Sequence, residues 1–143
     1  FVEEATITLM VDAAGVQGAA PVSINGAFIG YLLTNEVSGY LTSTFDADIT
    51  LIHDGDNEVV VSAPYSSGTD SYDDIQITNL KLRKTHEEEF IFNDEGIYHL
   101  GDQSLAEILD SYNSGTWNDP NPPPFWTELT GNAKTVPFTM DLP

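Results

Sequence analysis

The sequence contains no cysteine and only four lysine and arginine residues among 143. Without cysteine, disulfides and thiol chemistry are excluded. This suits a cytosolic protein, and equally a bacterial or archaeal surface protein that metal ions stabilise instead. With so few cations, the chain lacks the basic face that nucleic acids and anionic membranes require. No apolar run approaches the ~18 residues of a membrane-spanning helix, so we expect neither nucleic-acid partners nor membrane insertion.

Motifs of established catalytic chemistry are also missing. His53, His86 and His99 form neither an HxH nor an HExxH pair, which disfavours a transition-metal site. No GxSxG nucleophile motif and no phosphate-binding loop occurs. Asp73 and Asp74 precede a predicted strand, in which neighbouring side chains point to opposite faces and so would not share one substrate. We therefore expect that the protein is not an enzyme.

Acidic residues, by contrast, number 23, and the net charge is −19. Scattered acids serve solubility or solvation in high salt, but many here gather in short turn-like clusters. The clearest clusters are Asp54-Gly55-Asp56-Asn57, Asp70-Ser71-Tyr72-Asp73-Asp74 and Asn93-Asp94-Glu95-Gly96. Oxygen-rich groups of this kind suit hard cations such as calcium. The first cluster does not match the EF-hand loop, and it suits turn chemistry better than metal binding.

Apolar and polar residues alternate in short runs between turns, which predicts an all-β, antiparallel jelly-roll sandwich. Residues 5–11 and 136–142 read as strands, and Asn25-Gly26 as a type I′ hairpin turn. A second hairpin is expected where residues 49–52 and 59–63 flank the first acidic cluster. Residues 74–83 form a longer strand whose apolar phase shifts, so a bulge is expected near Thr78 or Asn79.

One short helix is expected after residue 103. Ser104 and Glu107 form a capping box, and four apolar side chains then share one face: Leu105, Ile108, Leu109 and Tyr112. Residues 117–126 are rich in proline and predict an extended surface loop. The main part of the sandwich is thus assigned to residues 1–85. Residues 86–143 supply the helix, the loop and a closing strand, which completes the same sandwich or that of a neighbouring subunit.

Several short motifs, taken in order, resemble galactose-binding-like jelly-roll modules of the carbohydrate-binding type. They are Ala5-Thr6-Ile7-Thr8-Leu9, Pro21-Val22-Ser23-Ile24-Asn25-Gly26 with Ile29-Gly30, Asp54-Gly55-Asp56-Asn57-Glu58-Val59, and Tyr72-Asp73-Asp74-Ile75-Gln76-Ile77-Thr78-Asn79-Leu80. The resemblance covers residues 5–83. It implies a mostly non-catalytic module that in many members binds sugars, with a structural calcium held by an acidic residue near the last strand. Asp73 or Asp74 occupies that position here.

The two halves of the resembling module stand in permuted order. Segments similar to its leading part come last in this chain, at residues 97–102, 125–126 and 136–142. Three explanations follow: a circularly permuted domain closed on itself, a segment of a tandem array, or strand exchange with a neighbouring subunit. Strand exchange builds open head-to-tail filaments, because the contact joins two different surfaces.

The leading functional hypothesis is a structural subunit or repeat of an extracellular or cell-surface filament, assembled from copies of itself by strand exchange. Calcium would stabilise it, with five candidate ligands: Asp73, Asp74, Asp94, Glu95 and Asp102. The alternative is a carbohydrate-binding module that stacks polysaccharide on Tyr72, Trp117 and Trp126. Tyr31, Tyr40 and Tyr65 also lie near predicted turns. Aromatic residues beside prolines equally serve to pin a loop to the core.

Overall fold

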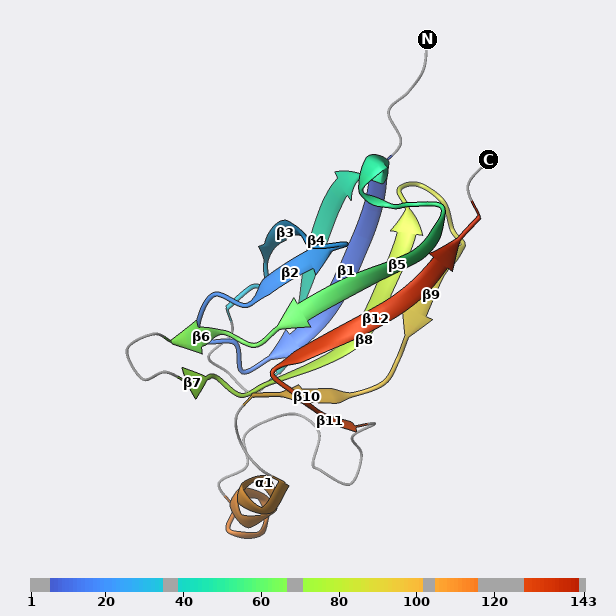
Figure 1. Cartoon of the computed structure of the whole chain (residues 1–143). Helices are drawn as coiled ribbons and strands as arrows, with labels where there is room; N and C mark the ends of the chain where they lie inside the picture. Colours follow the sequence, from blue (N-terminus) through green and yellow to red (C-terminus); the bar gives the residue numbers. More distant parts are fainter. Residues whose placement is uncertain (1–5, 35–38, 67–70, 102–104, 116–127, 142–143) are drawn as a thin grey trace.

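Two sheets pack face to face as a β-sandwich, which confirms the predicted all-β class (Figure 1). The computed structural model describes residues 6–34, 39–66, 71–101, 105–115 and 128–141. The larger sheet has the order β11-β10-β8-β1-β4, with β9 also paired to β8. Its strands are β1 (Thr6–Ala14), β4 (Leu41–Asp48), β8 (Ile75–Lys84), β9 (Phe90–Asp94), β10 (Tyr98–Leu100) and β11 (Glu128–Gly131). All its pairs are antiparallel except β10–β11.

The smaller sheet has the order β12-β5-β2-β3, and every pair in it is antiparallel. Its strands are β2 (Pro21–Ile24), β3 (Ala27–Tyr31), β5 (Gly55–Ser62) and β12 (Ala133–Met140). A two-stranded ribbon of β6 (Tyr65–Ser66) and β7 (Ser71–Tyr72) extends from one end of the sandwich (Figure 1). Residues of this ribbon and of β3 line a common depression.

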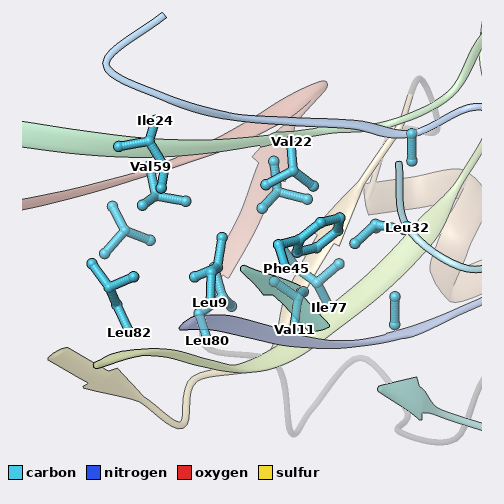
Figure 2. Packing of buried hydrophobic residues seen from close by; sticks show 14 of the residues in the cluster. Leu9, Val11, Val22, Ile24, Leu32, Phe45, Val59, Ile77, Leu80 and Leu82 are labelled. Carbon is cyan, nitrogen blue, oxygen red and sulfur yellow. The ribbon is translucent and has the colours of Figure 1, made fainter. Parts of the chain in front are cut away.

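Alternating strand positions fill the core between the sheets. Figure 2 shows Leu9 and Leu82, from the larger sheet, pointing toward Val22, Ile24 and Val59 of the smaller one. All five side chains are at most 1% exposed. Complete burial of an aliphatic side chain of this size contributes about 1.5–3 kcal/mol, so this interior is what holds the two sheets together.

The predicted bulge in β8 is confirmed. Met10 of β1 pairs with Lys81 and Asp12 pairs with Thr78, so β8 carries an extra residue between these pairs. Asn79 lies there with φ of +51°, and its side-chain amide donates to Asp12 Oδ2 at 2.8 Å. The bulge changes the phase of the strand, and for this reason apolar side chains on both sides of it face the core. These are Ile75, Ile77, Leu80 and Leu82.

The hairpin at Asn25-Gly26 is confirmed, with φ of +51° and +82° as a type I′ turn requires. The second predicted hairpin is wrong, because residues Ile49–Leu51 form a 3₁₀ helix rather than a strand. The Asp48 side chain caps that helix by accepting from the Thr50 N–H. The segment crosses from β4 in one sheet to β5 in the other. Buried Asn57 fixes it by bonding both the N–H and the carbonyl of His53.

Residues after 86 add strands to both sheets. Strand β12 pairs with β5 of the same chain, from Ala133 opposite Ser62 to Met140 opposite Gly55. Its side chains Val136 and Phe138 are buried, as the alternation predicted, while Leu142 lies outside the described residues. Strand β1 begins and β12 ends at the same end of the sandwich (Figure 1). This arrangement is compatible with a jelly roll.

The predicted helix is present as α1 (Leu105–Asn113). At the C-terminal end of the helix the Ser114 N–H donates to the Asp110 carbonyl, and Gly115 follows with φ of +79°. The predicted N-cap, Ser104, and the proline-rich segment 117–126 lie outside the described residues. Among the residues that the structure describes, no helix is long and apolar enough to cross a membrane.

Candidate functional site

An open groove, here called the aromatic groove, lies beside the β6–β7 ribbon. Its volume is about 350 Å³. Four aromatic rings line it together with small residues: Phe28, Tyr31, Tyr65 and Tyr72 with Ala19, Pro21, Ser62 and Ala63. None of these carries a charge at neutral pH, in a chain whose net charge is −19. Phe28, Tyr31 and Tyr65 are each more than half exposed, so core packing does not account for them.

A bulge in β3 creates the first aromatic pair. Val22 pairs with Gly30 and Ser23 pairs with Phe28, which leaves Ile29 as an extra residue. Residues three apart normally point to opposite faces of a strand, but the extra residue restores the phase. The Phe28 and Tyr31 rings therefore meet, with centroids 4.8 Å apart.

Glycine is required next to the extra residue of this bulge. Gly30 has φ of +153°, a conformation that residues with a side chain rarely adopt. A Cβ placed there would lie 2.8 Å from the Phe45 Cε1 atom, inside van der Waals contact. The Phe45 ring belongs to the core. The exposed aromatic pair is thus positioned by contact with the protein interior.

The second aromatic pair spans the ribbon. Tyr65 lies directly opposite Tyr72, and their ring centroids are 5.1 Å apart. Cross-strand aromatic pairs of this kind stabilise a short ribbon. The half-buried Tyr72 also packs against the hydrophobic core, so the exposed Tyr65 ring is held by an anchored neighbour.

A second depression, here called the polar hollow, adjoins the groove. It has a volume of about 480 Å³ and shares one lining residue with the groove, Tyr65. The others are Gln17, Gly18, Pro64, Ser66 and Asp73. The Asp73 Oδ2 atom accepts from the Gln17 N–H at 3.3 Å. Burial raises the pKa of the Asp73 carboxyl above its usual value, and bonds from the backbone N–H groups of Gln17 and Asp74 partly offset the rise.

Asp74 lies against Gly101, the residue that precedes Asp102. The pairing of β10 with β8 brings Gly101 beside Asp74, and a Cβ on Gly101 would lie 2.0 Å from Asp74 Oδ1. Only glycine allows this approach, with φ of +139°. Asp102 itself lies outside the described residues. The topology therefore places the residue before Asp102 in contact with one predicted calcium ligand.

Asp94 and Glu95 lie elsewhere. Asp94 pairs with Leu80, six positions along β8 from Asp74, which corresponds to ~20 Å at ~3.3 Å per residue. The Asp94 carboxylate accepts from the Gly96 N–H at 2.9 Å and from the Tyr98 hydroxyl at 2.5 Å. Within the described part of the chain, no group of three His, Asp or Glu side chains is placed to hold a metal ion. Calcium binding stays a prediction.

A buried histidine lies in β10. His99 is 1% exposed and pairs with Gln76, which is also completely buried. Burial lowers the pKa of His99 to about 4, so the ring is neutral at physiological pH. Because this side chain is closed off from solvent, its position argues for a structural role.

Sequence reasoning found part of the aromatic groove. Tyr72 is one of the predicted sugar-stacking residues, and Tyr31 and Tyr65 lie near predicted turns, whereas Phe28 is not among the predicted site residues. The segment Phe28-Ile29-Gly30-Tyr31 holds a recognisable feature, since a glycine inside a strand often marks a bulge. Trp117 and Trp126, the other predicted stacking residues, lie outside the described residues.

The chain was compared with protein-family models, curated proteins and solved structures. None of them matches it significantly. The β-sandwich rests on the structure itself. The galactose-binding-like type and the permuted order stay predictions from the motifs.

Proposed function

We propose that this chain is a non-catalytic carbohydrate-binding module of a secreted or surface protein, and that it binds glycans in the aromatic groove. The observation that carries the proposal is the exposure of three aromatic rings in one uncharged groove. Sugar rings present CH-rich faces that stack on aromatic rings, and paired rings offer such a face with little rotamer freedom to lose. The groove's volume falls within the usual range for small-molecule sites, ~300–1,000 Å³.

Local charge supports the same proposal. No charged residue occurs between Asp12 and Glu36, the stretch that contains β2 and β3. Elsewhere the acidic surface repels anionic ligands. A neutral ligand that needs aromatic contact fits this part of the molecule best. The resemblance of residues 5–83 to sugar-binding modules points to the same ligand class.

Binding to neutral polysaccharides, measured by affinity electrophoresis and calorimetry, tests the proposal. We expect Tyr31→Ala and Tyr65→Ala each to weaken binding about tenfold, which corresponds to ~1.4 kcal/mol. Leu41→Ala is the matched control, because Leu41 is exposed on β4 and does not line the groove. Binding that survives both tyrosine variants but disappears in Trp126→Ala would move the site to the proline-rich segment.

A second candidate is the strand-exchanged, calcium-stabilised filament subunit, and β12 is the observation that favours it. Among the described strands, β12 lies at one edge of the smaller sheet, where it pairs with β5 and buries Val136 and Phe138. An identical strand from a neighbouring copy would make the same hydrogen bonds and apolar contacts in trans. Calcium at Asp74 and Asp102 would then offset the repulsion between protomers that each carry −19.

Light scattering with and without calcium tests the filament. We expect calcium-dependent assemblies that fail to form when residues 136–143 are deleted. A wild-type chain that stays monomeric in calcium, or a truncated chain that polymerises undiminished, would contradict strand exchange. Either result leaves carbohydrate binding to be decided by its own experiment.

A further inference from the structure

We propose that the aromatic groove and the polar hollow are two adjoining subsites for one neutral glycan of at least two sugar units. In the second subsite, the Asp73 carboxylate accepts hydrogen bonds from sugar hydroxyl groups. This inference rests on the proposed carbohydrate function, and it adds a minimum ligand length and a specificity-determining residue.

The two depressions meet at one ring. Tyr65 lines both of them, Tyr72 lines only the groove, and Asp73 lines only the hollow. Tyr72 and Asp73 are consecutive, and successive side chains of an extended segment point to opposite sides. A linear ligand that stacks in the groove therefore reaches the carboxylate by passing over the exposed Tyr65 ring.

Asp73 is suited to bind hydroxyl groups. A carboxylate can accept about four hydrogen bonds. In the structure, Asp73 accepts hydrogen bonds from the backbone N–H groups of Gln17 and Asp74. None of the described residues that line the hollow is a lysine or an arginine, so no cation among them competes for the oxygens. Hydrogen bonds to an ionised acceptor are stronger than neutral ones. Vicinal hydroxyl groups on a second sugar unit match this acceptor.

The same carboxylate sets the ligand class. A uronate or sulfate group in the hollow would face Asp73 at short range, in a molecule that already carries a net charge of −19. Two negative charges at such short range repel each other, and this repulsion disfavours binding. The uncharged groove offers no compensating cation. Neutral oligosaccharides should therefore bind in preference to anionic ones of equal length.

Calorimetry with the whole chain and defined sugars tests the inference. The probes are neutral gluco-, galacto-, manno- and xylo-oligosaccharides of one to four units, and oligogalacturonates of the same lengths. Each is measured in EDTA and in calcium. For the wild type we expect the affinity to rise about tenfold when the ligand is lengthened from one sugar unit to two, both in EDTA and in calcium. Asp73→Ala should lose that gain yet bind single sugars normally, whereas Asp73→Asn should retain part of it.

Asp56→Ala is the control, because it removes the same charge from an exposed position outside both depressions. It should bind like the wild type. An unchanged gain in Asp73→Ala, a gain that requires calcium, or equal binding of oligogalacturonates would overturn the inference. In each of those cases, loss of binding in Tyr31→Ala would leave the proposed function standing. If no sugar binds the wild type at all, the proposed function itself fails.

Discussion

Gly30 links the core to the candidate binding surface, because a Cβ at this position would clash with the Phe45 ring and because Gly30 lies between Phe28 and Tyr31, whose rings meet. We expect Gly30→Ala to lower the free energy of unfolding by about 1–3 kcal/mol, through strain at a positive φ and a Cβ clash. It should also separate the aromatic pair and so weaken glycan binding. Urea denaturation and calorimetry measure the two effects.

Gly39→Ala is the matched control for that substitution. No atom of the described residues lies within 4 Å of a Cβ placed on Gly39, so the stability of this variant should differ from the wild type by no more than about 0.5 kcal/mol. If Gly30→Ala were as mild as this control, the described bulge would be wrong. Sequence reasoning had no means of finding the constraint, since Gly30 and Phe45 are brought together only by the packing of β3 against β4.

His99 predicts an acid-sensitive fold. The pKa of His99 falls from 6.5 to about 4 in the folded state. Between these two pH values, His99 is therefore protonated in the unfolded chain and neutral in the folded chain. The stabilisation is complete above pH 6.5 and is lost as the pH falls toward 4, by about 3 kcal/mol for a shift of this size. His99→Leu should remove that dependence. Urea titrations at pH 7, 5.5 and 4 measure it, and parallel curves for the two proteins would contradict the assignment.

At the scale of elements, the β8 bulge shows what sequence pattern can predict. The phase change between Ile77 and Leu80 is visible in the sequence, because the core demands apolar side chains on one face. The β2–β3 turn was equally accessible from Asn25-Gly26. In contrast, residues 49–52 are as apolar as a strand. Their 3₁₀ conformation depends on the Asp48 cap and on buried Asn57, which is supplied by the next strand.

Asn79 provides the test of the β8 bulge. Asn79→Gly keeps a residue that tolerates φ of +51° and loses only the hydrogen bond to Asp12. That loss should cost about 0.5–1.5 kcal/mol. Asn79→Ala loses the same bond and adds roughly 1 kcal/mol of left-handed strain. Chemical denaturation of the two variants compares them, and a glycine variant less stable than the alanine variant would contradict the bulge geometry.

At the scale of the whole molecule, charge dominates. A net charge of −19 works against compaction, so added salt should raise the melting temperature by screening alone. If Asp74 also binds calcium, calcium should raise the melting temperature several degrees more than magnesium does at equal ionic strength, because a ligand that binds only the folded state stabilises it. Asp74→Asn should cancel that difference, whereas Asp56→Asn should not. Differential scanning calorimetry measures the melting temperatures. If calcium and magnesium raise that of the wild type equally, charge screening alone explains the stabilisation and calcium binding at Asp74 is contradicted.

The ends of the described chain and the aromatic groove lie at opposite ends of the sandwich. Met140 pairs with Gly55 at the start of β5, whereas Ser62 at the end of β5 lines the groove. The strand advances seven positions between Gly55 and Ser62, which corresponds to ~23 Å. A partner domain or a surface joined at either end of the chain would therefore leave the groove facing outward. Under the proposed carbohydrate function, this separation would keep the aromatic groove accessible while the opposite end of the sandwich contacts another molecule.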